Sequence, residues 1–275
     1  MRRCVLVTGA TGFVGMQVLS HMLDLDVRIV VIVRESSREK ISSLGHPIEI
    51  ISSSDLFLES EEWWISVLQN IDTVIHLAWY AEPGEYLHSS KNIECLQGTL
   101  VMGSAASRSG VRRFVGIGTC AEYDSDCGYV SISSRVNPRT IYASCKASLF
   151  FTLSSLFEGN NVEFAWCRIF FLYGEGEDAR RLSPFLRAKF QAGEVAELRG
   201  GDNVRDFLDV KAAGKMIAET AVGSEQGAVN ICSGIPVTVR EFAEKIAAEY
   251  DALHLIKYGV PDSNSFDPPC LVGVL

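Results

Sequence analysis

The chain has 275 residues, of which 47% are hydrophobic and 21% charged, and its formal net charge is −9 at pH 7. An acidic surface repels phosphate backbones, so neither nucleic acid nor an anionic membrane is expected as a partner. No apolar run approaches the roughly 20 residues that cross a bilayer, and glycines interrupt the N-terminal apolar run too early for a signal peptide. The eight cysteines have no CxxC spacing, which argues against a metal site or a disulfide framework and favours the reducing cytoplasm.

Short apolar segments alternate with amphipathic segments through the first two thirds of the chain, which is typical of βαβ units. Val27–Val33 is apolar at six of its seven positions, as in a strand buried on both faces. The pattern predicts an α/β protein with a Rossmann-type, doubly wound, mostly parallel sheet. The expected strands are Cys4–Thr8, Val27–Val33, Ile48–Ile51, Thr73–Leu77, Phe114–Gly118 and Glu163–Ile169, and the expected helices are Phe13–Leu23 and residues 60–70, 86–109 and 139–158.

The alternation is lost after Arg168, where residues 174–205 are rich in glycine, arginine and glutamate. We predict a dinucleotide-binding domain at 1–170, with returning segments near 206–232, and a small C-terminal substrate lobe that comprises most of 171–275. The apolar composition of Cys270–Leu275 would be unusual for an exposed end and leaves open a continuation beyond Leu275. The elements expected after residue 205 are a returning strand at Asp206–Val210, a helix at 211–222, a strand at Val229–Ile231 and a helix at Val239–Tyr250.

A glycine-rich turn follows the first strand directly, with glycines at positions 9, 12 and 15. Glycine permits the tight turn, lets the backbone approach a pyrophosphate, and lets the helix pack closely on the strand. The pyrophosphate would meet the free N–H groups and the positive end of the helix that starts near Phe13. We therefore expect a dinucleotide to contact Gly9, Thr11, Gly12, Phe13, Val14 and Gly15.

The residues after the second strand bear on the choice between NAD and NADP. An acidic residue there would bind the ribose 2′-hydroxyl of NAD, whereas an arginine favours the 2′-phosphate of NADP. Arg34 occupies this place, with Ser36 and Arg38 close behind, so the sequence favours NADP(H). Glu35 keeps NAD possible, and a solvated loop of mixed charge is the alternative interpretation.

Tyr142 and Lys146 are separated by four positions. If this stretch is helical, they lie on one face about one turn apart, and the ammonium should lower the pKa of the phenol towards the working pH. Such a tyrosine can exchange a proton while a hydride moves at the same carbon. Taken alone, the pair is equally compatible with an ordinary surface of a helix.

The order of these motifs resembles the extended short-chain dehydrogenase/reductase family of the NAD-dependent epimerase/dehydratase type. Its TGxxGxxG turn is matched at Thr8–Gly15, its Ser/Thr at the end of the fifth strand by Thr119, and its YxxxK by Tyr142 and Lys146. The similarity covers nearly the whole chain in the right order. Further matching stretches are His76-Leu77-Ala78, Gly98-Thr99, Arg168 with Tyr173-Gly174, Arg205-Asp206-Phe207 and Asn230-Ile231-Cys232-Ser233-Gly234.

This resemblance implies hydride exchange between nicotinamide and a carbon of a nucleotide-linked sugar. It implies that Tyr142 is the acid/base, that Lys146 lowers its pKa and orients the nicotinamide ribose, and that Thr119 bonds the substrate oxygen. Arg205 would hold the diphosphate of the sugar nucleotide. Leu77 and Ala78 would line the cofactor site. Asp55 would contact adenine, although a turn residue explains it equally well.

Three departures from the family pattern affect the substrate site. Cys120 and Ala121 replace the Asp-Glu pair that dehydratases use, so dehydratase activity is not expected. Cys95 replaces an asparagine, with Asn92 one turn earlier, and Phe171 replaces an asparagine that seats the sugar nucleotide in epimerases. The diphosphate contact would then be rebuilt around Arg205, with help from Arg180, Arg181 or Arg187 unless these are plain surface charges.

Trp79 and Tyr80 follow the fourth strand directly, near the carboxyl ends of the strands, where such sheets bind ligands. Their rings would line a sugar pocket together with Cys120 and Phe171, or would pack in the core beneath the loop that follows. The sequence leaves both interpretations open.

The leading hypothesis is an NADPH-dependent 4-keto reductase of an NDP-4-keto-6-deoxyhexose. The alternatives are an NDP-sugar 4-epimerase with tightly bound NAD, a reductase of small carbonyl compounds, and an NADP sensor without catalysis. By analogy with the family, the helices at 86–109 and 139–158 would form a homodimer interface.

Overall fold

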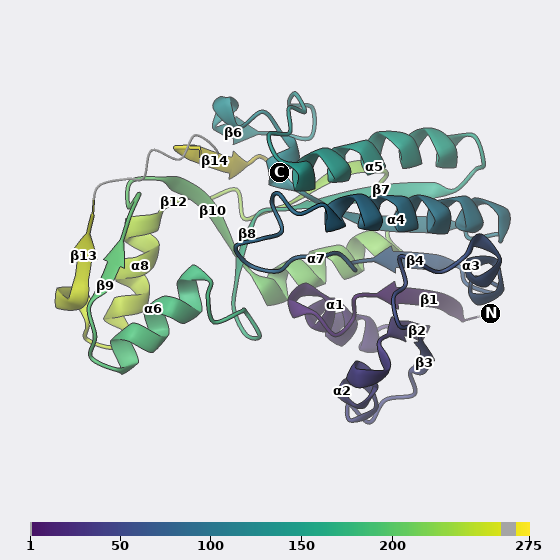
Figure 1. Cartoon of the computed structure of the whole chain (residues 1–275), viewed down its shortest axis with the longest axis horizontal. Coiled ribbons are helices and arrows are strands. Elements are labelled where there is room, and N and C mark those ends of the chain that lie inside the picture. Colours follow the sequence, from purple (N-terminus) through teal and green to yellow (C-terminus); the bar gives the residue numbers. More distant parts are fainter. Residues whose placement is uncertain (1, 260–267) are drawn as a thin grey trace.

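The structure is a computed structural model that describes residues 2–259 and 268–275. Its larger sheet has seven parallel strands in the order β11-β7-β5-β4-β1-β2-β3 (Figure 1). The order reverses at β1, as in a Rossmann fold, so the predicted fold class is confirmed. The strands are β1 (Arg3–Thr8), β2 (Val27–Val33), β3 (Glu49–Ser52), β4 (Thr73–His76), β5 (Arg113–Thr119), β7 (Glu163–Ile169) and β11 (Gly227–Ile231).

Helices cover both faces of this sheet. Alternate residues of β2 serve the two cores, with Ile29 and Val31 on the α1 and α7 side and Val30 and Ile32 on the other. This explains the continuous apolar run of β2, because a strand covered on both faces has no polar side. The helices are α1 (Phe13–Leu23) and α7 (Val210–Val222) on one face, α3 (Glu61–Val67), α4 (Lys91–Arg108) and α5 (Ile141–Glu158) on the other, and α2 (Arg38–Ser42) beside β2.

The expected helix at 86–109 begins only at Lys91. Residues 86–88 form turns instead, and the Ser89 hydroxyl accepts the Lys91 N–H at 3.3 Å where the helix begins. The other predicted elements of the larger sheet agree with the structure to within about three residues at each end.

A second sheet assembles segments that are far apart in the sequence. It has the order β12-β10-β14-β6, and β8 also pairs with β10. The predicted returning strand at Asp206–Val210 was therefore placed in the wrong sheet, since β10 belongs here and only α7 and β11 return to the larger one. The strands are β6 (Tyr129–Val130), β8 (Phe171–Tyr173), β10 (Val204–Asp209), β12 (Pro236–Thr238) and β14 (Cys270–Gly273).

The rest of the C-terminal lobe is a small helical layer with its own core. Phe207 stacks on Phe242 with ring centroids 3.9 Å apart, and Leu186, Phe190 and Ile246 are buried with them. The elements are α6 (Leu182–Gln191), β9 (Ala196–Leu198), α8 (Val239–Ala248) and β13 (Ile256–Tyr258), which pairs with β9. Residues 260–267 of the predicted lobe lie outside the described part of the chain.

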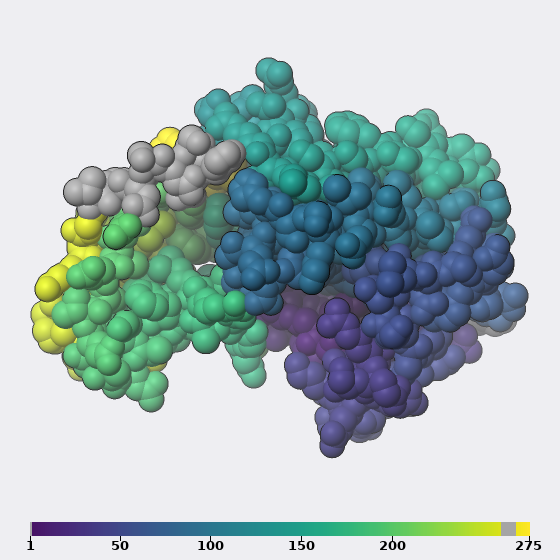
Figure 2. Space-filling model, viewed as in Figure 1, coloured from purple at the N-terminus to yellow at the C-terminus, as the bar shows by residue number. Residues whose placement is uncertain are grey.

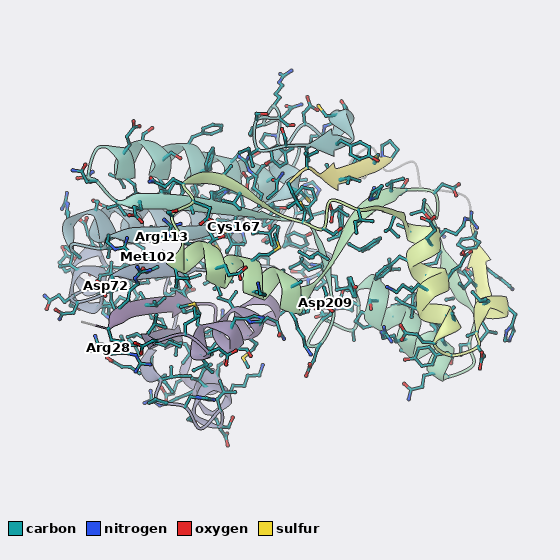
Figure 3. All side chains as sticks on the ribbon, turned by 180° about the vertical axis from the view of Figure 1, so that it is seen from behind. Arg28, Asp72, Met102, Arg113, Cys167 and Asp209 are labelled. Atoms are coloured by element: carbon teal, nitrogen blue, oxygen red, sulfur yellow. The ribbon has the colours of Figure 1, made fainter. Side chains whose placement is uncertain are left out.

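Asp209 marks the passage between the two parts of the molecule. It ends β10, and its side chain accepts the Lys211 N–H at 2.7 Å to cap α7 (Figure 3). The space-filling view shows the surface hollowed between the green C-terminal lobe and the purple N-terminal third (Figure 2). Among the described residues, no helix is long and apolar enough to cross a membrane.

Candidate active site

Close backbone contacts require glycine at two positions of the turn after β1. Gly9 has φ +71°, and a Cβ on it would lie 2.6 Å from the Ala78 nitrogen. A Cβ on Gly15 would lie 2.0 Å from the Gly9 oxygen, inside van der Waals contact. Gly12 is exposed and would meet only the Gly9 oxygen, at 3.4 Å. Two glycines therefore let the chain pack on itself, and the third leaves its outer side open to a ligand.

Helix α1 presents free backbone donors at this turn. Its first intrahelical bond runs from the Met16 N–H to the Gly12 oxygen at 3.0 Å, so the N–H groups of Phe13, Val14 and Gly15 precede the helical ladder. Gly12 has no side chain to cap them. These donors and the positive helix end fit the pyrophosphate of a dinucleotide.

A buried hydrogen-bond chain fixes the crevice between β1 and β4. His76 Nδ1 lies 2.8 Å from the Thr8 hydroxyl, and His76 Nε2 lies 3.0 Å from the Thr99 hydroxyl. Since Thr99 donates its own proton to the Cys95 oxygen, it must accept from Nε2–H, which leaves Nδ1 as an acceptor. Burial lowers the pKa of His76 to about 3, so the ring is neutral and structural.

Leu77 and Ala78 follow this histidine along the glycine turn. The Leu77 N–H donates to the Thr8 carbonyl at 3.2 Å, and the Ala78 N–H donates to the Thr8 hydroxyl at 3.3 Å. The structure therefore places both residues beside Gly9, where the sequence predicts the cofactor.

The predicted adenosine end of the crevice is made of exposed and half-buried side chains. Arg34 precedes the short helix η1 (Glu35–Ser37) and is exposed, as is Ser36. Glu35 accepts a 2.5 Å hydrogen bond from Ser52, which ties its carboxylate to β3. Asp55 Oδ1 accepts a hydrogen bond from the Phe57 N–H at 3.0 Å, so this oxygen already stabilises the turn that follows Asp55.

Tyr142, Lys146 and Thr119 come together where α5 crosses the end of β5. The Thr140 hydroxyl caps α5 by accepting the Ala143 N–H at 3.2 Å, which puts Tyr142 in the first turn and Lys146 one turn later. Lys146 Nζ donates to the Ile117 carbonyl of β5 at 2.7 Å. The Thr119 hydroxyl lies near Tyr142 and favours the phenolate, which lowers the pKa of the phenol. This arrangement is compatible with the roles predicted for Tyr142 and Thr119.

The expectation of a lowered Tyr142 pKa is wrong for the protein alone. Desolvation of the phenol raises the pKa above its usual value, the nearby Tyr86 adds to this, and the Thr119 hydroxyl only partly opposes it. Burial also lowers the pKa of Lys146 to about 7. The physical reason is that burial penalises both charged forms, and Lys146 points to Ile117 and to an aromatic ring.

That ring belongs to Trp79. Its centroid lies 3.8 Å from Lys146 Nζ, and its Nε1–H donates to the Asn92 side chain at 2.8 Å. Tyr80 turns elsewhere, since its hydroxyl donates to Glu85 at 2.6 Å and its ring lies 4.7 Å from Lys91 Nζ. Trp79 therefore lies beside the predicted catalytic residue Lys146, whereas the Tyr80 side chain contacts Glu85 and Lys91.

Cys120, Phe171 and Arg205 gather on the lobe side of Thr119. Burial raises the pKa of the Cys120 thiol to about 12, and the nearby Arg205 charge opposes this rise. The Arg205 guanidinium is 3% exposed and lies 5.2 Å from the Phe171 ring. Cys120 is therefore a neutral, small side chain, and Arg205 is a buried cation close to it.

A sequence model of the NAD dependent epimerase/dehydratase family matches residues 5–232. The chain belongs to this family. The predicted family is thereby confirmed, and with it the prediction of an NAD(P)-dependent enzyme of the short-chain dehydrogenase/reductase type.

Individual relatives within the family have different activities. The chain is 25% identical to a dTDP-6-deoxy-L-talose 4-dehydrogenase (NAD(+)) of Aggregatibacter actinomycetemcomitans over 98% of each protein. A UDP-N-acetylglucosamine 4-epimerase of Methanobrevibacter ruminantium matches in fold with a TM-score of 0.86 at 22% identity, over 100% of this chain and 90% of that one. A dTDP-glucose 4,6-dehydratase of Streptomyces venezuelae, solved with NAD, matches with a TM-score of 0.81 at 21% identity, over 98% of this chain and 87% of that one. The last two likenesses show the fold.

Glu122 was missed as a site residue by the sequence analysis. It is fully buried and accepts hydrogen bonds from the Thr119 N–H at 2.9 Å and from Arg168 Nε at 2.8 Å. Trp166 Nε1 donates to it as well, at 3.0 Å. Burial raises the pKa of this carboxyl and the Arg168 charge opposes the rise. Glu122 thus holds the backbone of Thr119 in place, and the Thr119-x-x-Glu122 spacing of a capping box was the signal for it.

Tyr86 is a second missed residue. Its ring meets the Tyr142 ring edge-on at 4.9 Å, and the backbone of its loop is tied to α5 by a 3.1 Å bond from the Tyr142 N–H to the Leu87 carbonyl. Arg181 lies 5.4 Å from the Tyr86 ring on the lobe side. No sequence signal singled out Tyr86, because only the folded loop brings it to α5.

The remaining arginines considered for the diphosphate have carboxylate partners. Arg180 pairs with Glu82 at 2.7 Å and with Asp178 at 2.8 Å, and Arg187 pairs with Glu249 at 2.5 Å. These contacts fit the interpretation as surface charges. Within the described residues, no group of three or more histidine, cysteine or acidic side chains is placed to hold a metal ion.

Proposed function

We propose that the protein reduces the 4-keto group of an NDP-4-keto-6-deoxyhexose with NADPH. The observation that carries the proposal is the convergence of Tyr142, Thr119 and Lys146 beside the glycine-turn crevice. Cys120, neutral at physiological pH, and Ala121 stand where a dehydratase has its acidic pair. The site therefore has one acid for a ketone oxygen and lacks the acidic pair for loss of water.

A bound nicotinamide supplies the hydride to the carbonyl carbon. Tyr142 donates its proton to the carbonyl oxygen, and its raised pKa keeps it protonated before that step. Thr119 donates a hydrogen bond to the same oxygen and orients it. Lys146 places positive charge near the phenolate that forms, and solvent then returns the proton to Tyr142. One ketone, one NADPH and one proton thus give one alcohol and NADP+.

The talose 4-dehydrogenase supports the position of the reaction on the sugar. Oxidation of a C4 hydroxyl is the reverse of reduction of a 4-keto group, so one site serves both directions. Arg205 would bind the diphosphate, because it is a cation held beside Cys120 where the lobe meets β5. Trp79, Cys120 and Phe171 would form the wall around the sugar.

We propose NADP(H) as the preferred cofactor because Arg34 stands at the ribose end of the crevice. NAD remains the alternative, since the name of the talose dehydrogenase and the dehydratase structure both specify it. Asp55 would contact the adenine with the oxygen that does not serve its turn.

We infer a homodimer formed through α4 and α5. Both helices expose large apolar side chains, with Ile93 47%, Ile141 40% and Phe151 55% exposed. Such side chains gain free energy when a second copy covers them. Light scattering on the purified protein tests the dimer.

We also propose a cytoplasmic setting, which the eight free cysteines fit.

The proposal is tested by absorbance of reduced nicotinamide with purified protein and dTDP-4-keto-6-deoxyglucose. Stoichiometric loss of the NADPH signal, faster than with NADH and absent with Tyr142→Phe, is expected. No loss with any NDP-keto-sugar would overturn it. Bound NAD in the denatured protein, together with sugar interconversion without added cofactor, would establish the 4-epimerase instead.

A further inference from the structure

Lys146 has an unusual environment for a lysine. Only 3% of it is exposed, and its Nζ donates to the Ile117 carbonyl at 2.7 Å. On another side the face of Trp79 lies 3.8 Å from Nζ, and Trp166 is more distant at 5.9 Å. An ammonium has three N–H donors, and the carbonyl and the aromatic face account for two of them.

The indole of Trp79 is itself held by a buried amide. Its Nε1–H donates to Asn92 Oδ1 at 2.8 Å, and Asn92 is completely buried. The Asn92 NH2 group donates to the carbonyls of Tyr86 at 2.6 Å and Ser89 at 2.8 Å. Every polar atom of the Asn92 side chain therefore has a protein partner, and the indole ring has one fixed orientation.

The same amide supports both catalytic side chains. Asn92 orients Trp79 against Lys146 and also binds the backbone of Tyr86, whose ring contacts Tyr142 at 4.9 Å. Trp79 and Tyr142 are likewise in edge-to-face contact at 6.5 Å. An aromatic wall thus runs from Asn92 to Lys146 and Tyr142.

We propose that Trp79 is a positioning residue for Lys146, whose ammonium its indole face holds against β5 by a cation–π contact. The attraction exists only while Lys146 is charged, so the ring stabilises the protonated form as well as its place. Burial away from water destabilises the charged form of Lys146. The two effects can be separated by replacing the Trp79 ring with another apolar side chain, which keeps water out of the site. The inference rests on the proposed function only in that Lys146 serves Tyr142.

Several other titratable groups lie around Lys146 and act on the same equilibrium. Glu122 favours the charged form, as do the Cys95 and Cys145 thiols if they ionise, whereas burial disfavours it. The titratable groups that interact with Lys146 are His76 of β4, Cys95 of α4, Glu122 of η2 (Cys120–Glu122) and Cys145 of α5. These groups are the same in every variant below, so a difference in the Lys146 pKa between variants measures the effect of the Trp79 ring.

The experiment measures the pKa of Lys146 directly, by NMR of the protein labelled with ¹³C at the lysine ε carbon. Lys146→Met identifies the signal. The wild-type signal is expected to titrate near pH 7. In Trp79→Leu, which stays apolar but has no ring, the pKa should fall by about half to one unit, and in Trp79→Phe by less. Trp63→Leu on α3 is the matched control and should leave it unchanged.

A second arm avoids any change in packing. Fluorinated tryptophan draws electron density from the ring face at nearly constant shape, so it should lower the Lys146 pKa in the wild type and much less in Trp79→Phe. This arm decides the question if Trp79→Leu does not fold. A Lys146 pKa in Trp79→Leu equal to or above the Trp63→Leu value, or no effect of fluorination, would overturn the proposal.

Neither arm uses a substrate, so its result is independent of the sugar. With an active substrate, Trp79→Leu should move the alkaline limb of kcat to lower pH by the same amount, with KM changed less than kcat. Failure of all NDP-keto-sugars with a normal Lys146 titration would count against the proposed function and leave the role of Trp79 standing.

Discussion

The two ends of the cofactor crevice are built in different ways. At the nicotinamide end, Lys146 and Thr119 are 3% and 7% exposed, and each is bonded to the backbone of β5 or its continuation. At the adenosine end, Arg34 and Ser36 are exposed on a short helix. Burial holds the chemistry in one geometry and perturbs pKa values, whereas exposed side chains select a cofactor through contacts screened by water. Changes at the buried end should therefore have the larger effects.

The largest effect is expected from Tyr142→Phe. Loss of the proton donor should lower kcat by about 100- to 10,000-fold, the range typical of general acids. The ring contacts with Tyr86 and Trp79 stay, so the affinity for NADPH should change by less than about threefold. Steady-state kinetics and a cofactor titration measure the two quantities. Activity within tenfold of the wild type would remove Tyr142 from its role.

Lys146→Met should stabilise the fold while abolishing activity. The folded pKa of Lys146 is lowered from 10.5 to about 7, so the unfolded chain binds more protons between these pH values. Wild-type stability should thus rise by about 1.4 kcal/mol per pH unit from this group across that window, and below pH 7 the full penalty is present. Urea unfolding of both proteins should show the advantage of the variant shrinking as the pH rises.

The exposed Lys245 provides the control for that experiment. Lys245→Met should leave the pH dependence of unfolding as in the wild type. A stability difference between wild type and Lys146→Met that stays constant from pH 6 to 10 would show that Lys146 is not desolvated in solution.

Two alanine substitutions in the glycine turn form a matched pair, and their effects should be of intermediate size. Gly15→Ala puts a Cβ 2.0 Å from the Gly9 oxygen, so the backbone must shift, at about 1–3 kcal/mol of stability. Gly12→Ala adds a Cβ that meets only one atom, at 3.4 Å, so the fold should stay intact and cofactor affinity should be the quantity that falls. Thermal unfolding and cofactor titration separate the two results, and equal loss of stability in both variants would contradict this division.

The smallest effect is expected at Arg34. Arg34→Ala should weaken NADPH binding by about 5- to 30-fold, the value of one charged hydrogen bond in an exposed setting, and leave NADH binding nearly unchanged. Arg38→Ala is the variant for comparison, because Arg38 already donates a hydrogen bond to Ser52 at 3.2 Å and is less available to a cofactor. Equal losses for both cofactors in Arg34→Ala would assign the site to NAD.

Local patterns predicted the cofactor half well. The glycine spacing, the apolar run of β2 and the spacing of Tyr142 and Lys146 each depend on backbone geometry within one or two turns of the chain. The second sheet escaped prediction because its strands β6, β10 and β14 start at residues 129, 204 and 270, so no local pattern shows that they pair. Within the apolar segment Cys270–Leu275, Leu271 and Val272 are buried in this sheet, whereas Val274 and Leu275 are exposed.

The sequence by itself determined the family and the Rossmann topology, because these follow from local spacing and from the order of motifs. Only the tertiary structure decided how the predicted catalytic residues are tuned. It placed Trp79 on Lys146 and Tyr86 against Tyr142, through contacts between segments that are distant in the chain. Burial, which raises the pKa of Tyr142 and lowers that of Lys146, is a property of the packed molecule, so no motif could reveal it.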